Sequence, residues 1–224
     1  MVHNQHLEAT NDFVLQRISM VKKQIQARGI KDKRVLKAIA DVPRHLFVPD
    51  EFISRAYDDS ALPIGYDQTI SQPYIVALMC ELANLSPNAR VLEIGTGLGY
   101  QAAVLSQIVK EVYTIEIVEN LGALAEIGLQ ELGDENVYVK IGDGYAGWPE
   151  HGPYDAILIT AAVKEIPSAL LDQLSLNGKL IAPLGSGDSQ ELICFLKIRD
   201  SLIKKSLGIV RFVPFKRGAA HCQK

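Results

Sequence analysis

The sequence predicts an α/β fold: a doubly wound, mostly parallel seven-stranded sheet with a C-terminal antiparallel hairpin and an N-terminal helical extension. Three observations lead to this prediction. Residues 91–108 have the pattern of a strand, a glycine turn and a helix. Four further apolar strand patterns alternate with helical ones as far as residue 183, which is typical of a parallel sheet. Two long apolar runs then follow, on either side of a polar turn at residues 199–201, and predict the hairpin.

Length and composition narrow the class of protein. A chain of 224 residues with 48% hydrophobic residues can form one large domain, and a net charge of −3 does not favour an electrostatic nucleic-acid binder. No apolar run approaches the ~20 residues of a membrane span, and residues 1–6 lack the features of a signal peptide. Cys80, Cys194 and Cys222 are odd in number and far apart, which predicts neither a disulfide framework nor a zinc site and suits the cytoplasm.

The N-terminal part predicts two helices and a cover for the site. Residues 12–29 run from an N-cap at Asp12 to a stop at Gly29, with one apolar stripe that consists of Val14, Ile18, Val21 and Ile25. Asp32 caps a second helix, which Pro43 ends, and residues 42–49 follow as an extended segment. Because this block precedes the first strand of the sheet, we expect it to cover the substrate side.

A loop rich in turn formers and hydroxyl groups spans residues 57–73 and leads into a helix whose apolar side consists of Ile75, Val76, Met79 and Leu82. Ser71 stands directly before Gln72 and Pro73, which suit a first helical turn. Two interpretations of Ser71 stay open. It is an N-cap, worth about 1 kcal/mol, or it is a site residue, since a helix N-terminus also offers amides to an anion.

The glycine turn after the first strand predicts the ligand. Gly95, Gly97 and Gly99 are spaced G-x-G-x-G, one residue short of the G-x-G-x-x-G that binds a pyrophosphate, so the turn suits a ligand without phosphate. Glu93, just before it, can hold an ammonium group. Glu116 ends the second strand, where a carboxylate accepts hydrogen bonds from ribose hydroxyls. A tight turn without a ligand is the alternative, but together these residues favour S-adenosylmethionine.

The later elements bring further residues to the same edge of the sheet. A helix follows whose apolar face consists of Leu121, Leu124, Ala125 and Leu129, and residues 137–141 form the third strand. Asp143 at its end can bond an adenine amino group or form an Asx-type turn. Residues 154–160 form a buried fourth strand. The chain continues from its carboxyl end through Thr160, Ala161 and Ala162, and open α/β sheets place their sites at this end.

The last third predicts a helix and three strands. The helix covers residues 167–176, and a turn at Asn177 and Gly178 leads into a strand at residues 179–183. Residues 192–198 and 202–213 form the hairpin. Lys216, Arg217 and Lys224 make the end mildly basic, which we interpret as a solvated terminus.

With these residues assigned, the chain closely resembles the bacterial protein-L-isoaspartate O-methyltransferases. The resemblance extends over nearly the whole chain, and the matching stretches are residues 42–49 (VPRHLFVP), 61–65 (ALPIG), 68–73 (QTISQP), 91–105 (VLEIGTGLGYQAAVL), 142–149 (GDGYAGWP), 154–162 (YDAILITAA) and 210–214 (VRFVP). Many class I methyltransferases of Rossmann-like fold share the glycine motif, whereas QTIS together with VRFVP is far more specific to this family.

The resemblance implies transfer of a methyl group from S-adenosylmethionine to the α-carboxylate of L-isoaspartyl residues, whose ester collapses to a succinimide and initiates repair. It implies Ser71 as the catalytic residue. We expect the cofactor-binding residues to be Thr69, Ile70, Gln72, Glu93, Gly95, Thr96, Gly97, Gly99, Glu116, Ile117, Asp143, Gly144 and Thr160. We expect the substrate to meet Ser71, Thr160, Ala161 and Ala162, with no metal site.

Further expectations concern partners and organisation. The resemblance implies that the partners are damaged proteins and peptides. From the net charge, the lack of a long apolar run and the cysteines we expect no nucleic acid, no membrane and a cytoplasmic location, and a monomer is the default expectation. Residues 1–224 form a single domain, in which residues 1–71 are the N-terminal helical, substrate-side extension and residues 72–224 are the cofactor-binding core with the C-terminal strands. The chain departs from the family at two positions that concern substrate range. Similar members often have glycine at the position of Asp67 and proline at the position of Lys164. Both are most simply solvated loop charges.

The reaction requires little acid–base chemistry. A substrate carboxyl with a pKa near 4 is already ionised at neutral pH, so the expected role of Ser71 is to donate a hydrogen bond that orients it. The alternatives are a methyltransferase of this fold with a small-molecule or nucleic-acid substrate, an NAD-dependent oxidoreductase, and a relative that binds the cofactor without turnover. The net charge disfavours nucleic acid, and the glycine spacing disfavours NAD.

Overall fold

A seven-stranded sheet forms the centre of the computed structural model, which describes residues 12–199 and 201–218. The order across the sheet is β5-β4-β3-β6-β7-β8-β9. The strands are β3 (Arg90–Ile94), β4 (Glu111–Glu116), β5 (Val137–Ile141), β6 (Tyr154–Ile159), β7 (Leu174–Leu184), β8 (Gln190–Ile198) and β9 (Ser201–Val210). The strands from β3 to β7 pair in parallel, and β8 and β9 are antiparallel. The predicted fold class is confirmed.

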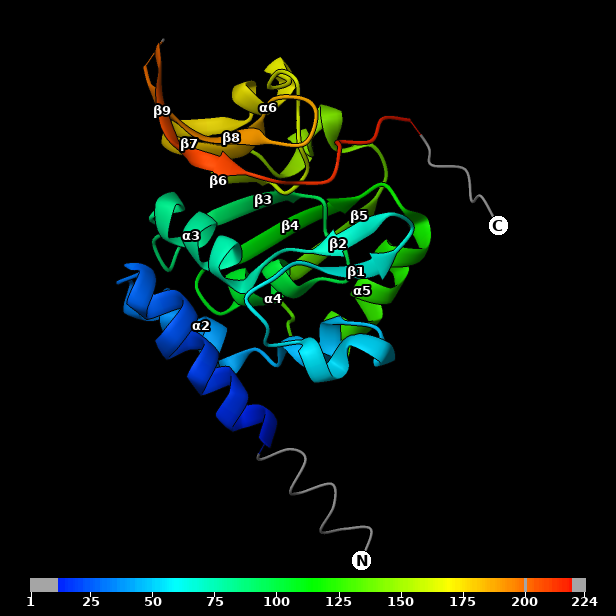
Figure 1. Cartoon of the computed structure of the whole chain (residues 1–224). Coiled ribbons are helices and arrows are strands. Elements are labelled where there is room, and N and C mark those ends of the chain that lie inside the picture. Colours follow the sequence, from blue (N-terminus) through cyan, green and yellow to red (C-terminus); the bar gives the residue numbers. More distant parts are fainter. Residues whose placement is uncertain (1–11, 200, 219–224) are drawn as a thin grey trace, which may run out of the picture.

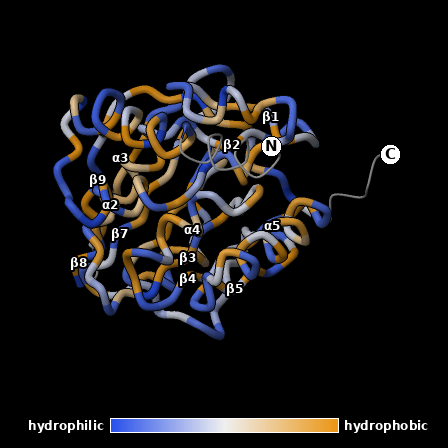
Figure 2. Tube along the Cα trace, turned by 90° about the horizontal axis from the view of Figure 1, so that it is seen from below, coloured by the Kyte–Doolittle hydropathy of each residue, from blue (hydrophilic) through white to orange (hydrophobic). Residues whose placement is uncertain are grey.

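Helices cover both faces of the sheet (Figure 1). On one face, seen from below in Figure 2, lie α3 (Pro73–Ala83), α4 (Tyr100–Ser106) and α5 (Glu119–Glu131), which share a core with the N-terminal helices, one of them α2 (Lys33–Asp41). On the other face lie α6 (Ser168–Asp172) and the short 3-10 helices η5 (Gly144–Ala146) and η6 (Pro149–His151). Strand residues alternate between the two cores, so that Val91 faces the first and Leu92 the second.

The sheet changes direction of growth beside β3, and this places the site. The chain runs outward through β3, β4 and β5, then returns to pair β6 on the other side of β3. At such a switch point the carboxyl ends of neighbouring parallel strands leave a crevice between the connections that diverge from them. Glu93, Glu116 and Thr160 stand at or next to these ends, as the sequence predicted.

The first N-terminal helix differs from its prediction. Residues 12–20 are α-helical, but η1 (Val21–Ile25) is a π-helix and η2 (Gln26–Arg28) is a 3-10 helix that ends at Gly29. The apolar stripe is therefore wrong in part: Val14 is 37% and Ile18 53% exposed, whereas Met20 and Ile25 are buried. A single 3.6-residue period does not hold where the helix changes its winding.

Two N-terminal segments are more structured than predicted. Residues 42–49, expected to be extended, contain the 3-10 helix η3 (Arg44–Phe47), and η4 (Asp50–Arg55) follows it. The expected loop at residues 57–73 contains an antiparallel hairpin of β1 (Leu62–Gly65) and β2 (Gln68–Ile70). Its turn residues Tyr66 and Asp67 have φ of 54° and 57°, which residues other than glycine, asparagine or aspartate rarely adopt. Figure 1 shows this hairpin beside the carboxyl ends of the central strands.

Three predictions for the later part were also wrong, one about a buried face and two about where elements end. Leu124 is 55% exposed, outside the buried face of α5. The last predicted helix is only α6, because β7 already begins at Leu174 and continues through the residues expected to form a turn. The last strand ends at Val210 and not at residue 213. The interpretations of residues 1–6, Cys222 and Lys224 lie outside the described residues.

Candidate active site

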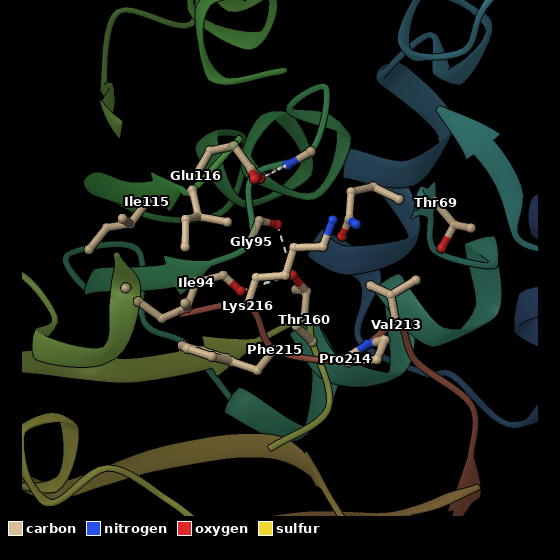
Figure 3. A pocket seen from close by; sticks show the side chains of 15 residues that line it. Thr69, Ile94, Gly95, Ile115, Glu116, Thr160, Val213, Pro214, Phe215 and Lys216 are labelled. Carbon is tan, nitrogen blue, oxygen red and sulfur yellow. Dashed lines mark hydrogen bonds between the residues drawn. The ribbon is translucent and has the colours of Figure 1, made fainter. Parts of the chain in front are cut away.

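Two adjoining cavities open at the carboxyl ends of β3, β4 and β6. The first cavity (Figure 3) is lined by Gln68, Thr69, Ile94, Gly95, Gly97, Ile115, Glu116, Ile117, Gly144, Thr160, Ala161 and residues 213–216. The second cavity is lined by Ile64, Thr69, Ile70, Ser71, Val76, Glu93, Gly95, Thr96, Gly97, Leu98, Tyr100, Gln101 and Thr160. Because Thr69, Gly95, Gly97 and Thr160 belong to both, the two cavities can accommodate the two ends of one ligand.

The glycine turn forms the wall between the cavities with bare backbone. Gly95 has φ of 103°, and a Cβ atom there would lie 2.3 Å from Thr160 Oγ1. That hydroxyl lies 2.9 Å from the carbonyl oxygen of Ile94 and 2.8 Å from that of Gly95, so Thr160 braces the turn from β6. Gly97, with φ of 58°, lies against Ile64 of the hairpin, whose side chain a Cβ would approach to 3.2 Å. Only glycine therefore fits this turn without strain.

Glu93 is fully buried at the end of β3 and takes part in a chain of hydrogen bonds. Its Oε2 accepts from Thr114 Oγ1 at 2.7 Å, and Thr114 Oγ1 lies 2.6 Å from Thr96 Oγ1. The other oxygen, Oε1, is buried and has no hydrogen-bond partner among the described residues. Buried polar atoms in native proteins nearly always have a partner, so Oε1 marks a place where a donor is expected.

Glu116, at the end of β4, links the glycine turn to the segment that follows β4. Its Oε2 accepts the Gly97 N–H at 2.8 Å and its Oε1 accepts the Val118 N–H at 2.9 Å. Each oxygen keeps a lone pair, because a carboxylate has about four acceptor positions. The side chain lines the first cavity, where these lone pairs can accept hydroxyl groups.

The electrostatics of both carboxylates favour a bound cation. Burial raises the pKa of Glu93 to about 8, against the hydrogen bond from Thr114, and Glu116 raises it further. Burial also raises the pKa of Glu116, although the backbone N–H groups of Val118 and Gly97 oppose this. Neither group has an ion pair within residues 12–199 and 201–218. A positively charged ligand would relieve the cost of burying them.

Ser71 lies between the second cavity and a groove. The groove, with a volume of about 570 Å³, runs from Ser71 and Gln72 past Tyr74 of α3 to residues 207–212 at the end of β9. The N-cap interpretation of Ser71 is wrong, because α3 is capped by Gln72, which makes no side-chain cap hydrogen bond. Within the described chain the Ser71 hydroxyl has no partner, so it is available to a ligand.

The C-terminal segment forms a cover that the sequence did not predict. The side chain of Lys216 extends across the first cavity (Figure 3), and its Nζ donates to the Tyr66 carbonyl oxygen at 3.1 Å. Arg217 Nε donates to Asp143 Oδ2 at 3.1 Å, and the guanidinium carbon of Arg217 lies 3.5 Å from the centre of the Tyr145 ring. The interpretation as a solvated end is therefore wrong for Lys216, which lines the first cavity, whereas the Arg217 side chain is still 56% exposed. The VRFVP match at residues 210–214 was the one signal nearby.

The structure brings most of the predicted site residues together. The two cavities contain Thr69, Ile70, Ser71, Glu93, Gly95, Thr96, Gly97, Glu116, Ile117, Gly144, Thr160 and Ala161, and the groove contains Gln72. Gly99, Asp143 and Ala162 lie outside both cavities. Gly99 packs against Leu129 of α5, and Asp143 forms the Asx-type turn by accepting the Tyr145 N–H at 2.9 Å. Lys216, Tyr100 and Gln101 are lining residues that sequence reasoning missed.

Other kinds of site are less supported by the described residues. Among residues 12–199 and 201–218 no group of three or more histidine, cysteine, aspartate or glutamate side chains is placed to hold a metal ion. No helix in that part of the chain has the length and apolar character needed to cross a membrane. Asp67, at the hairpin tip, and Lys164 are both exposed.

Comparisons with known proteins agree with this geometry. Residues 16–220 match the family model described as protein-L-isoaspartate(D-aspartate) O-methyltransferase. The protein-L-isoaspartate O-methyltransferase of Synechococcus sp. (strain JA-2-3B'a(2-13)) is 52% identical over 95% of this chain and 90% of its own length. A protein-L-isoaspartate O-methyltransferase 2 of Shewanella sediminis is 54% identical over 90% of this chain and 83% of that relative.

Solved structures give the same result. A protein-L-isoaspartate O-methyltransferase superposes with a TM-score of 0.81 at 33% identity, covering 90% of this chain, which spans 65% of the length of that structure. A putative protein-L-isoaspartate O-methyltransferase of Plasmodium falciparum, solved in complex with S-adenosyl-L-homocysteine, gives a TM-score of 0.77 at 27% identity and covers 90% of this chain and 99% of its own.

Proposed function

Because the chain belongs to the protein-L-isoaspartate(D-aspartate) O-methyltransferase family, we propose that its two cavities bind S-adenosylmethionine and that the groove beside Ser71 receives the damaged peptide. The chain is an S-adenosylmethionine-dependent methyltransferase that acts on L-isoaspartyl residues in the repair of damaged proteins. The proposal concerns which of its residues do this. The buried carboxyl groups of Glu93 and Glu116, which have no ion pair among the described residues, carry it.

These residues fit a donor that has positive charge and no phosphate. When bound, S-adenosylmethionine supplies a reactive methyl group on a sulfonium centre. The buried Oε1 of Glu93 lacks a partner among the described residues and can accept from an ammonium group, and Gly95 lines both cavities with backbone that carries no side chain. Among residues 12–199 and 201–218, Lys216 is the one cation that lines the two cavities, so these residues do not form the cluster of basic groups that a pyrophosphate would favour.

Further residues would hold the nucleoside end in the first cavity. The free lone pairs of Glu116 are placed to accept ribose hydroxyls, and Ile94, Ile117 and Phe215 offer apolar surfaces to the base. Gly144 packs closely against Ile94, because a Cβ atom on Gly144 would lie 2.3 Å from the Ile94 side chain. The segment after β5 can therefore come close to a base that rests on Ile94. Asp143 remains the predicted partner of the adenine amino group.

In the groove, we assign Ser71 to the substrate. Its free hydroxyl donates a hydrogen bond that orients the α-carboxylate of the isoaspartyl residue, which is ionised at neutral pH and needs no base. Thr160 and Ala161 line the first cavity next to the glycine turn, and Ala162 follows them in the chain. Among the strands that the structure describes, none lies beyond the outer edge of β9, so a peptide backbone can pair with this edge along the groove. Exclusion of water by the bound cofactor and peptide would favour a step in which opposite charges cancel.

We also propose that the chain works as a single-domain monomer in the cytoplasm, without nucleic acid or membrane. One core unites Met20 and Ile39 of the N-terminal extension, residues 1–71, with Val104 and Ile181 of the core unit, residues 72–224. The net charge of −3 does not favour nucleic acid, and the cysteines Cys80 and Cys194 are unpaired.

Incubation with methyl-labelled S-adenosylmethionine and paired peptides tests the proposal. The peptides differ only in an aspartyl or an L-isoaspartyl residue. We expect a base-labile methyl ester on the isoaspartyl peptide alone. Labelling of neither peptide, or of both equally, would contradict it.

A further inference from the structure

Gln101 is a buried side chain of the second cavity whose amide has no hydrogen-bond partner. It is the second residue of α4 and is 7% exposed. Its Oε1 and its Nε2 are both buried, and neither bonds to any other described residue. A glutamine amide has two donor hydrogens and an acceptor oxygen, and native proteins rarely bury such a group unused. Since the side chain lines the cavity, a polar group of a ligand is the expected partner.

The surroundings of Gln101 differ in charge from those of Glu93. Tyr100 precedes it in the same cavity, and the guanidinium carbon of Arg44 lies 4.8 Å from the centre of the Tyr100 ring. Arg44 is fully buried, donates from Nε to the Ala56 carbonyl oxygen at 2.8 Å and has no salt bridge within the described part of the chain. Burial lowers the pKa of Arg44 to about 10, so it stays charged at neutral pH.

The second cavity therefore contains two kinds of unused groups. Glu93 offers an acceptor oxygen, whereas Gln101 offers amide donors next to Tyr100 and the buried cation behind it. A zwitterionic amino acid has the complementary pair of groups, an ammonium and a carboxylate. The methionyl end of S-adenosylmethionine is such a zwitterion.

We propose that Gln101 binds the α-carboxylate of the methionyl end of the cofactor through its Nε2–H group, while Glu93 accepts from the α-ammonium. Gln101 is thus a specificity-determining residue that distinguishes the complete cofactor from adenosyl thioethers that lack the amino-acid end. This inference rests on the proposed function, because it requires the cavities to bind S-adenosylmethionine. A buried water molecule in contact with the amide is the other explanation.

Binding measurements with three ligands separate these explanations. S-adenosylhomocysteine carries both charged groups, S-adenosyl-3-thiopropylamine lacks the carboxylate, and 5′-methylthioadenosine lacks both. In the Gln101→Met variant, which keeps the length of the side chain, we expect calorimetry to show about a ten- to hundredfold loss of affinity for S-adenosylhomocysteine. The affinities for the two truncated ligands should stay within about twofold of the wild type, since their contacts are unchanged.

Two further variants complete the test. Gln101→Glu places a negative charge beside the carboxylate and should weaken S-adenosylhomocysteine more than Gln101→Met does, whereas a stronger binding would assign Gln101 to the ammonium instead. Gln107→Met, at the exposed C-terminal end of the same helix, should change none of the three affinities. The ligand-free Gln101→Met protein should melt no lower than the wild type, since the amide has no partner to lose.

The failure of this inference is distinct from failure of the proposed function. Unchanged binding of S-adenosylhomocysteine in Gln101→Met, as a water-filled site would give, overturns the inference. An equal loss for all three ligands also overturns it, because it would mean that Gln101 acts through the fold. Absence of S-adenosylhomocysteine binding in the wild-type protein would instead reject the proposed function.

Discussion

The raised pKa of Glu93 predicts that cofactor binding releases a proton. In the ligand-free protein this pKa is about 8, so the carboxyl is roughly 90% protonated at pH 7. An ammonium group next to Oε1 favours the ionised form and lowers the pKa by about 1 to 3 units. A decrease of ~2 units leaves about 10% protonated, so that about 0.8 proton leaves for each ligand bound at pH 7. At pH 9 the release falls below about 0.1 proton, because the free protein is already ionised.

Calorimetry measures this release directly. S-adenosylhomocysteine is titrated into the protein in phosphate and in Tris, whose ionisation enthalpies differ, and the slope of the observed enthalpy against the ionisation enthalpy gives the number of protons. The same linkage predicts that the affinity increases about 20- to 30-fold between pH 6 and pH 8. The ligand 5′-methylthioadenosine, which has no ammonium group, should show almost no release.

Two variants show whether Glu93 is the source of the proton. Glu93→Gln cannot titrate and should abolish both the proton release and the pH dependence of affinity. Glu111→Gln is the matched control, because the hydrogen bond from Arg90 lowers the pKa of Glu111, which is already ionised at pH 7 and lies outside the cavities. An enthalpy that does not depend on the buffer at pH 7, or an equal release from Glu93→Gln, would refute the reasoning.

The remaining predictions concern single side chains. Ser71→Ala should lower turnover of an isoaspartyl peptide about 10- to 100-fold and leave S-adenosylhomocysteine affinity within about twofold, as hydrogen bonds to charged groups are worth that much. Equal turnover would reject its role. Glu116→Ala should weaken S-adenosylhomocysteine at least about tenfold by calorimetry, and unchanged binding would count against the ribose contact. Lys216→Ala should speed release of the ligand about fivefold in stopped flow, because it removes the hydrogen bond to Tyr66, whereas the exposed Lys204→Ala should not. Because the folded pKa of Glu93 is raised from 4.5, its neutral form adds stability that is present below pH 4.5 and lost as the pH rises through 8. Ligand-free wild type should therefore lose ~4–5 kcal/mol more of its unfolding free energy than Glu93→Gln between pH 4.5 and 9 in urea titrations, and parallel curves would contradict this.

Local patterns in the sequence determined the strands of the sheet and most of the site residues at their carboxyl ends. The apolar runs of β3, β4, β5 and β6 and the helices between them are set by short-range periodicity, so the alternation that builds a parallel sheet was predictable. The position of Glu93, the glycine turn and Glu116 followed, because residues at the carboxyl ends of adjacent parallel strands necessarily meet at one edge.

The hairpin of β1 and β2 escaped the sequence for a local reason. Its turn uses Tyr66 and Asp67 in left-handed conformations, where the usual signal is asparagine or glycine. The packing of Ile64 against Gly97, and the bond from Asn120 Nδ2 to the Tyr66 hydroxyl at 2.6 Å, support that turn, and both partners lie far away in the sequence.

Only the tertiary structure decided what closes the cavities. Lys216 meets the Tyr66 carbonyl across 150 positions of sequence and Arg217 meets Asp143 across 74, so neither contact leaves a trace in periodicity or turn propensity. The same holds for Gln101, which the sequence shows only as one more polar residue of a short helix. Packing buries its amide at the cavity that Glu93 also lines. Sequence determines which segments form strands and helices because those forces act between near neighbours. Which polar groups are left unpaired in a cavity depends on how distant segments pack.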